Sequence, residues 1–462
     1  MLDKNLVADV LTAALSTGGS FAEVFVENTV RNNIVLINNA VDRSNSGIDY
    51  GVGIRIFDGT NAVYAYTNDS SADNLIKVAK SAAQAVKERN HTKVDNFVVL
   101  NYDNISPAKR AFNSAPKSEI VEILRVGGKA AMEFDAQITQ TQLIYMDVTS
   151  DILVANSEGV WGEDHRVRTR SMLSAVASSA SEKQTAGRSV GAQKGLELYD
   201  DVDFASLGRN AAEEAVRMLS AKYAPSGKMP VVIDNGFGGV IFHEACGHSL
   251  EATGVAKKAS EFWDKKGTQV APDIVSAVDD GTMPGEWGSQ NMDDEGGKPA
   301  RNVLIENGVL KSFLIDKRNG LKMGEKSTGN GRRQDYRFAP TSRMTNTFIC
   351  AGKSTHDEII AATEYGLYAK RMGGGSVNPP TGEFNFAVLE AYIIRNGKIA
   401  EPVRGASLIG RGSEVLKNID MVGDTMTMDT GMCGSISGAV PTNVGQPMIR
   451  VSEITVGGRS DQ

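Results

Sequence analysis

Two of the chain's five histidines lie in one short segment beside a carboxylate. Residues 242–248 read FHEACGH, so that His243 and His248 flank Glu244. Neutral imidazoles are common zinc ligands, and a carboxylate next to them supplies a base that accepts a proton from water. The segment therefore indicates a hydrolytic metal site.

The spacing of these histidines differs from the common zinc-binding pattern H-E-x-x-H. In that pattern the histidines are four residues apart and share one helix face, whereas His243 and His248 are five apart. Five residues correspond to about 140° around a regular helix. Both side chains reach one metal only if the helix has a π-type turn or ends near Gly247. The spacing alone leaves two interpretations open, a shared metal ion or two separate histidines that are buried or on the surface.

Several motifs along the chain resemble one known family. The histidine segment, continued by Ser249-Leu250-Glu251, resembles the HExxxH motif of the TldD/PmbA metallopeptidases, long described as modulators of DNA gyrase. The similarity extends through most of the chain, in the segments GVGIR (51–55), TGNGRR (328–333), RMTNT (343–347), YGLYAKRMGGG (365–375), VGQP (444–447) and TVGG (455–458). The chain is thus similar to the TldD-like branch, which carries the metal motif.

This resemblance implies a zinc-dependent peptidase with a defined set of site residues. His243 and His248 correspond to metal ligands, Glu244 to the catalytic base, and Cys433 to the third ligand, in a Met-Cys-Gly segment. Imidazole and thiolate suit Zn²⁺, and three protein ligands leave a fourth position open. The family usually continues after Cys-Gly with Lys-x-Gly-Gln, whereas this chain has Ser435-Ile436-Ser437-Gly438. The substrate side of the site therefore departs from the family pattern.

The resemblance also implies substrates and partners. Family members act on unfolded or short peptides within a closed chamber, and form dimers, with themselves or with a paralogue that lacks the metal motif. Long β edges favour holding such peptides by strand addition. The alternative hypothesis is a non-catalytic regulatory or binding protein of the gyrase-modulator type, with a structural metal or none. A saturated site with four ligands would favour that alternative.

Other residues of reactive types are weaker candidates. Glu251 is an alternative third ligand, and so is Cys246, although a small buried thiol on an apolar stretch is more typical of a core. Cys350 is expected in the core. We assign no chemistry to the remaining histidines, which are His91, His165 and His356.

Two further patterns suggest ligand binding less strongly. The run Gly373-Gly374-Gly375-Ser376 follows a predicted helix, so we interpret it as a helix stop and tight turn rather than a phosphate loop. Arg332, Arg333 and Arg343 are candidates for holding a peptide carboxylate, but isolated arginines are more often solvated or structural.

Composition limits the class of protein. Of the 462 residues, 41% are hydrophobic and 23% charged, which is typical of a globular chain and excludes a disordered one. Lys and Arg number 49 against 56 Asp and Glu, a net charge of −7 that argues against direct nucleic-acid binding. Three cysteines and no long apolar stretch predict a cytoplasmic protein without a membrane segment.

The elements of the first half alternate between helices and strands. Helical periodicity covers 2–15, 74–89, 118–134 and 204–220, and strand patterns cover 22–26, 34–37, 52–57, 62–66 and 142–154. The early strands form a meander, and the amphipathic pattern of 2–15 is not that of a signal peptide. The segment 224–228, APSGK, has the composition of a linker.

The second half is predicted to be mainly antiparallel β. After a strand at 230–233 comes the apolar helix that bears the histidines, and Asn-Gly pairs at 307–308 and 396–397 predict two hairpins. A helix is expected over 355–372, with Thr355 and Glu358 forming a capping box. We therefore predict an α+β fold, with an N-terminal α/β domain (1–224) and a β-rich, largely antiparallel C-terminal domain (228–462) that carries the metal-site helix.

Overall fold

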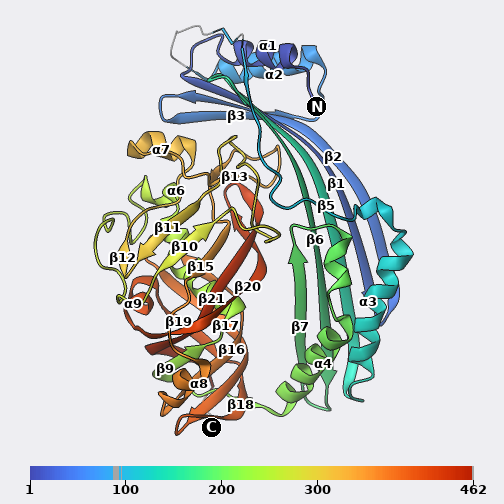
Figure 1. The fold of residues 1–462 in the computed structure, drawn as a ribbon, viewed down its shortest axis with the longest axis vertical. Coiled ribbons are helices and arrows are strands. Elements are labelled where there is room, and N and C mark those ends of the chain that lie inside the picture. Colours follow the sequence, from blue (N-terminus) through green and yellow to red (C-terminus); the bar gives the residue numbers. More distant parts are fainter. Residues whose placement is uncertain (87–92, 95, 460–462) are drawn as a thin grey trace.

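The chain forms two β-rich bodies that lie side by side (Figure 1). The computed structural model describes residues 1–86, 93–94 and 96–459. One body is a long curved sheet with helices at both ends, and the other is a compact body built around the C-terminal strands. The predicted α+β class is confirmed. No helix of the described residues is long and apolar enough to cross a membrane.

The first body is an almost entirely antiparallel sheet in the order β3-β2-β1-β5-β6-β4, with β7 paired to β6. Only β4 runs parallel to its neighbour β6. The strands are β1 (Phe21–Ile37), β2 (Ala40–Asp58), β3 (Asn61–Thr67), β4 (Val98–Leu100), β5 (Ile138–Asn156), β6 (Val160–Ser178) and β7 (Lys183–Ala192). The helices are α1 (Lys4–Ala14), α2 (Ala72–Ala83), α3 (Lys117–Met132) and α4 (Phe204–Ser220), with short 3₁₀ turns η1 (Phe112–Ser114) and η2 (Leu196–Asp200).

Each end of this sheet has its own hydrophobic core. Helices α1 and α2 cover one end, where Val24 and Ile54 are fully buried, and α3 and α4 cover the other, around Ile34 and Leu143. Within residues 21–37, the sequence predicts strands only at 22–26 and 34–37, one at each of these ends. The polar residues 27–33 between them are nevertheless part of β1, because β2 and β5 satisfy their backbone groups on both sides.

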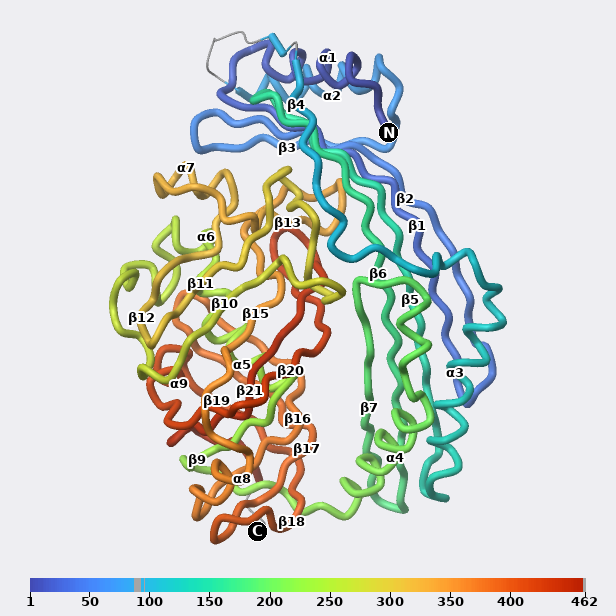
Figure 2. The backbone as a smooth tube through the Cα atoms, viewed as in Figure 1, coloured from blue at the N-terminus to red at the C-terminus, as the bar shows by residue number. Residues whose placement is uncertain are grey.

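The second body contains a closed ring of hydrogen-bonded strands, β21-β9-β16-β17-β19, returning to β21. Other strands extend the sheet from this ring. The strands are β8 (Lys222–Tyr223), β9 (Gly227–Ile233), β10 (Ala277–Asp280), β11 (Arg301–Glu306), β12 (Val309–Leu310), β15 (Asn346–Ile349), β16 (Tyr365–Asn378), β17 (Glu383–Arg395), β18 (Lys398–Arg404), β19 (Ser407–Arg411), β20 (Ile419–Ser435) and β21 (Gly438–Gly457), with β13 (Gly331–Arg332) and β14 (Thr341–Ser342) as a separate pair. Figure 2 traces these strands around the helical segment that follows β9.

That segment is a single helical path with changing pitch. It consists of η3 (Gly236–Gly239), α5 (Val240–Phe242), the π-helical turn η4 (His243–Gly247) and η5 (His248–Leu250). Its residues Val240, Ile241 and Phe242 are buried in the core of the second body. The remaining helices are α6 (Ala252–Val255), α7 (Lys317–Met323), α8 (His356–Ala361) and α9 (Gly412–Lys417).

Most predicted elements are present, but one helix prediction is wrong. Both Asn-Gly hairpins form, and α4 covers the predicted residues 204–220. The capping box of Thr355 and Glu358 starts α8, yet this helix ends at Ala361, and residues 365–378 form β16. The glycine run 373–375 is therefore neither a helix stop nor a tight turn but an irregular part of β16. Pairing with β9 and β17 outweighs the local helical preference of this segment.

Smaller differences concern helix ends and the domain boundary. The predicted helix 74–89 ends at Ala83 as α2, and residues 87–89 lie outside the described residues. The predicted helix 118–134 is α3. The division of the chain at 224–228 stays a prediction.

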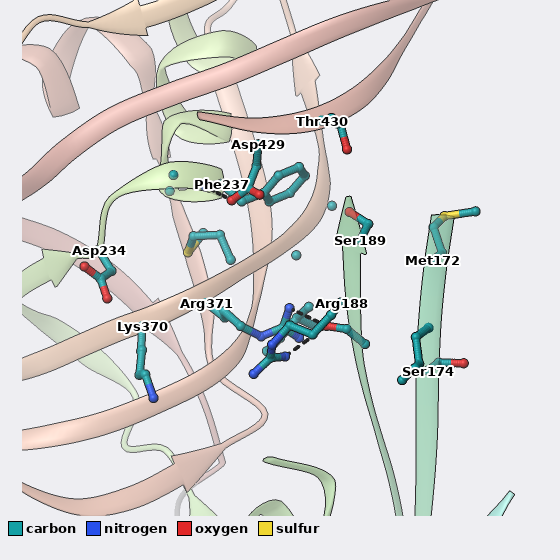
Figure 3. A pocket seen from close by; sticks show the side chains of 18 of the residues that line it. Met172, Ser174, Arg188, Ser189, Asp234, Phe237, Lys370, Arg371, Asp429 and Thr430 are labelled. Atoms are coloured by element: carbon teal, nitrogen blue, oxygen red, sulfur yellow. Dashed lines mark hydrogen bonds between the residues drawn. The ribbon is translucent and has the colours of Figure 1, made fainter. Parts of the chain in front are cut away.

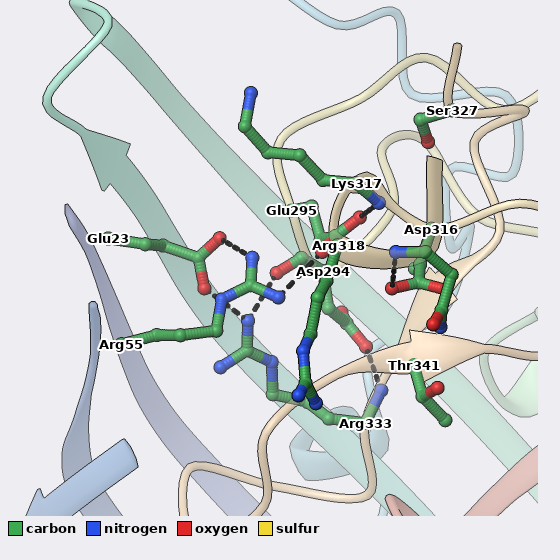
Figure 4. A network of polar contacts seen from close by, with 12 residues as sticks. Glu23, Arg55, Asp294, Glu295, Asp316, Lys317, Arg318, Ser327, Arg333 and Thr341 are labelled. Carbon is green, nitrogen blue, oxygen red and sulfur yellow. Dashed lines mark hydrogen bonds and ion pairs between the residues drawn. The ribbon is translucent and has the colours of Figure 1, made fainter. Parts of the chain in front are cut away.

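Buried charges join the two bodies (Figure 4). Arg55 of β2 donates to Glu23 of β1 at 2.5 Å and to Glu295 of the second body at 2.7 Å. Arg333, also of the second body, donates to Glu23 at 2.6 Å. These side chains are at most 3% exposed. Removing one partner would leave a buried charge uncompensated, at a cost of about 3–5 kcal/mol, so the network fixes how the bodies sit against each other.

Candidate metal centre

The π-helical turn brings the two histidines of the motif to one point. The backbone N–H of His248 donates to the carbonyl of His243, five residues back, as in a π-helix. This is one of the two distortions that the sequence predicts. The start of the helical path lies tightly on β21, since a Cβ on Gly239 would stand 2.5 Å from the carbonyl oxygen of Gly445.

Cys433 completes the group from a distant part of the chain. It lies near the end of β20, opposite Val440 of β21, and is 5% exposed. Its Sγ is 3.3 Å from Nε2 of His243 and 3.2 Å from Nε2 of His248. The three potential ligand atoms all lie within 4.8 Å of one another. The structure thus brings together the three residues that the resemblance marks as ligands.

The donor set fits a zinc ion. In a tetrahedral site with Zn–N near 2.1 Å and Zn–S near 2.3 Å, a ligand nitrogen and sulfur are separated by about 3.6 Å. The two N···S separations here, 3.3 and 3.2 Å, are close to that value. Two imidazoles and a thiolate are also a preferred donor set of zinc.

The charges of the group fit a cation between the donors. Burial opposes ionisation of the Cys433 thiol, but His243 and His248 hold its pKa well below the usual value. Burial likewise disfavours a charged His248, but Glu251 and Cys433 raise the pKa of His248 well above the usual value. The site therefore favours a thiolate with positive charge beside it, which a divalent metal supplies as well as a proton does.

Glu251 lies behind His248. Its Oε2 is 3.0 Å from Nδ1 of His248, on the opposite side of the imidazole from the Nε2 that faces Cys433. A carboxylate in this position fixes the ring orientation and leaves Nε2 free to bind a metal. The sequence offers Glu251 as an alternative metal ligand. This geometry instead suits Glu251 to orient the metal ligand His248.

Arg343, which the sequence offers as a candidate for holding a peptide carboxylate, instead connects the two halves of the centre. It is fully buried and donates to the carbonyl oxygen of Cys433, to that of Gly438 at 2.7 Å and to the Ser437 hydroxyl at 3.0 Å. Its Nε lies 3.9 Å from Glu251. Arg343 is thus structural, and Ser437, one of the residues that depart from the family pattern, helps to hold the hairpin of Cys433.

Glu244 faces an open cavity next to the group. Its Oε2 is 3.5 Å from Nε2 of His248, and its side chain is 23% exposed. The cavity measures about 440 Å³, and the residues lining it include Glu244, His248, Lys257, Ser376, Pro379 and Ser435. Glu244 thus lies next to the nitrogen of His248 that would face a metal, and both water and a substrate can reach it. Hydrolysis requires a general base in such a position.

The other end of the same helical path borders a larger cavity between the bodies (Figure 3). This cavity measures about 630 Å³. Asp429 of β20 accepts a hydrogen bond from the backbone N–H of Phe237 at 2.8 Å, and so satisfies a backbone donor in the first turn of the helical path. Across the cavity, Arg188 and Arg371 share the buried carboxylate of Glu214. The contact of Asp429 anchors the start of the helical path that carries His243, and those of Glu214 join β7, α4 and β16.

The remaining candidates lie outside the group. Cys246 is 2% exposed in the core, where burial and Glu261 raise its pKa well above the usual value. Cys350 is half-buried at the end of β15. His165 pairs with exposed Asp151 at 2.7 Å, and His356 is half-buried in α8. His91 lies outside the described residues.

Three family models match the chain. They describe domain 1, the central domain and the C-terminal domain of PmbA/TldA metallopeptidases, and match residues 22–86, 110–219 and 226–458. Together they span most of the chain.

Individual relatives agree with these models. "Metalloprotease TldD homolog" of Haemophilus influenzae is 36% identical over 448 residues, covering 95% of this chain and 93% of its own. "Zinc metalloprotease TldD homolog" of Saccharolobus solfataricus is 29% identical over 262 residues, 56% of this chain and 58% of its own. The crystal structure of TldE from Thermococcus kodakarensis superposes with a TM-score of 0.79 at 18% identity, covering 98% of this chain and all of the other.

Proposed function

Because the chain belongs to the PmbA/TldD metallopeptidase family, we propose that it is a zinc-dependent peptidase that hydrolyses unfolded or short peptides. His243, His248 and Cys433 are the proposed metal ligands, and Glu244 is the proposed general base. One observation carries this assignment. Three donors of types that zinc prefers converge within 4.8 Å, and a carboxylate open to solvent stands beside one of them.

A bound zinc ion supplies Lewis acidity, which makes water more acidic and a peptide carbonyl more electrophilic. The chain's own residues transfer the proton and orient the metal ligands. Glu244 accepts the proton of the attacking water and returns it to the leaving amine. Glu251 holds the imidazole of His248 through Nδ1, and Arg343 holds the backbone of Cys433, so that both stay oriented during the reaction.

The surroundings of the group support a catalytic rather than a purely structural metal. The group found among the described residues has three members, and the carboxylate of Glu251 faces the far side of His248. The adjoining cavity of about 440 Å³ gives a peptide room to approach. A regulatory protein with a saturated structural metal would need a fourth donor here.

The proposal extends to the setting in which the protein works. We propose a cytoplasmic dimer, formed with itself or with a paralogue that lacks the metal motif, without direct contact to nucleic acid or membrane. Ser435, the first residue of the departure from the family pattern, lines the cavity of Glu244, so we expect cleavage preferences that differ from those of relatives with the usual pattern.

Metal removal and restoration test the proposed chemistry. We expect the purified chain, alone or with a paralogue, to cleave an unfolded peptide, to lose this activity after treatment with a chelator, and to regain it with about one Zn²⁺ per chain. Mg²⁺ serves as the control ion, because a site of two imidazoles and a thiolate binds it poorly. Cleavage that continues at full rate in the metal-free protein would refute the proposal.

A further inference from the structure

A second cavity between the two bodies lies on the other face of the hairpin that carries Cys433. It measures about 330 Å³. We refer to it as the arginine cavity, because six arginines are among the residues that line it: Arg31, Arg166, Arg168, Arg332, Arg333 and Arg337. Met432, Ala439 and Pro441 of the β20–β21 hairpin form part of its wall.

Four of these arginines have carboxylate partners. The pairs are Arg31 with Glu27 at 3.8 Å, Arg166 with Asp294 at 2.6 Å, Arg333 with Glu23 at 2.6 Å, and Arg337 with Asp335 at 3.0 Å. Figure 4 shows the contacts of Arg333. Within the described part of the chain, Arg168 and Arg332 have no carboxylate within 4.0 Å. The cavity therefore holds two guanidinium groups that form no ion pair, although Asp294 acts on both from farther away.

The contacts of these two arginines are with neutral carbonyl groups. Arg168 donates to the carbonyl oxygens of Trp287 at 3.0 Å and Ser289 at 2.6 Å. Arg332 is 3% exposed and donates to the carbonyl oxygen of Met344 at 2.5 Å. Carbonyl groups satisfy hydrogen bonds but do not neutralise the two positive charges, and each guanidinium keeps further N–H groups.

The guanidinium groups of Arg168 and Arg332 both have lowered pKa values. Burial, with Arg166 and Arg332 nearby, lowers the pKa of Arg168 to about 9. Burial lowers the pKa of Arg332 to about 10, although Asp294 opposes the effect. Arg332 is buried and Arg168 is half-buried, and two such cations in one cavity are costly unless an anion joins them.

We propose that the arginine cavity binds a carboxylate group of a ligand between Arg168 and Arg332. The planar guanidinium fork matches a carboxylate in geometry, and one negative charge suits the space between the two cations. A more highly charged anion such as phosphate fits less well, because four carboxylates also line the cavity: Glu27, Asp49, Asp294 and Asp335.

Two sources of the carboxylate share this chemistry. One is a small free carboxylate, and the other is the C-terminal carboxylate of a peptide, a reading that rests on the proposed peptidase function. Met432 lines the arginine cavity, whereas the sulfur of its neighbour Cys433 belongs to the metal group. Successive residues of a strand point to opposite faces, so the two sites share β20 as a common wall.

Isothermal titration of the full-length protein tests the proposal with three probes: succinate, a pentaalanine peptide with a free C-terminus, and the same peptide amidated. We expect succinate or the free peptide, but not the amidated one, to bind. Arg332→Gln and Arg168→Gln should each weaken this binding about tenfold or more, since each removes a charge-assisted contact. Binding of the free peptide without succinate identifies the peptide terminus, and binding of succinate identifies a small carboxylate.

The matched control is Arg337→Gln, which removes an arginine that lines the same cavity but already has two carboxylate partners. We expect it to leave the affinity unchanged. Binding should persist after metal removal, which separates this site from the proposed peptidase centre. Each arginine variant relieves a repulsion but loses hydrogen bonds to carbonyl groups, so its unfolding temperature without ligand is measured first to show that it is folded. The proposal is overturned if no carboxylate probe binds, or if the affinities of the Arg168 and Arg332 variants match that of the wild type.

Discussion

Replacing Gly247 with alanine should disturb the metal centre through a single steric contact. A Cβ at this position would stand 2.3 Å from Sδ of Met344, which is fully buried. Ordinary contacts of this kind need about 3.5–4.0 Å, so one group has to move by more than about 1 Å. Gly247 is the last residue of the π-helical turn and directly precedes His248, and Met344 follows Arg343. The clash therefore displaces the backbone next to His248, or Met344 and with it the neighbouring Arg343.

Two opposing effects set the size of the change. The backbone at Gly247 is right-handed helical, so alanine gains about 1 kcal/mol of helix propensity. Overpacking of a buried site costs about 1–3 kcal/mol. We expect the clash to prevail and to lower the free energy of unfolding by up to about 2 kcal/mol, with a loss of zinc affinity of about tenfold or more as His248 shifts.

Urea unfolding of the metal-free protein and competition with a zinc chelator measure the two effects. Gly434→Ala is the matched control, because a Cβ there meets no atom within 4 Å although the residue adjoins Cys433. We expect this control to keep both stability and zinc affinity. Unchanged stability and zinc affinity in Gly247→Ala would refute the view that Met344 fixes the turn.

Two further substitutions test the roles assigned around the metal. Cys433→Ala should remove most of the bound zinc, as measured by elemental analysis, while Cys350→Ala, a half-buried cysteine outside the group, should retain it; full zinc content in Cys433→Ala would show that the third ligand is misassigned. Glu251→Gln should keep the fold but lower zinc affinity about 10- to 100-fold in chelator competition, because the amide holds Nδ1 of His248 less well, and an unchanged affinity would contradict the orienting role.

Local sequence chemistry accounts for the elements that could be predicted. The Asn-Gly hairpins form with positive φ at Asn307 and Gly308, as their turn type requires. The helix α4 follows its own apolar period. Residues 365–378 show the limit of such patterns. Their strand conformation depends on pairing with β9 and β17, and local propensity carries no information about that pairing.

The candidate site likewise has a part that the sequence predicts and a part that it does not. The unusual spacing of His243 and His248 is enough to predict a distorted helix, and the structure contains the π-helical turn. Only the family resemblance pointed to Cys433, because 185 residues separate it from His248 and the hairpin geometry brings them together. Arg343 lies in a recognised motif, but its role depends on burial and on contacts with Cys433 and Glu251 that a sequence does not display.

The most direct test of the account is the rate at which Glu244→Gln cleaves an unfolded peptide at zinc content equal to that of the wild type. The amide keeps the size of the side chain but accepts no proton, so we expect the rate to fall by about 10²- to 10⁴-fold. Glu383→Gln, which makes the same change at an exposed carboxylate on β17, should cleave at the wild-type rate. Equal rates for Glu244→Gln and the wild type would show that Glu244 is not the base and would contradict the proposed mechanism.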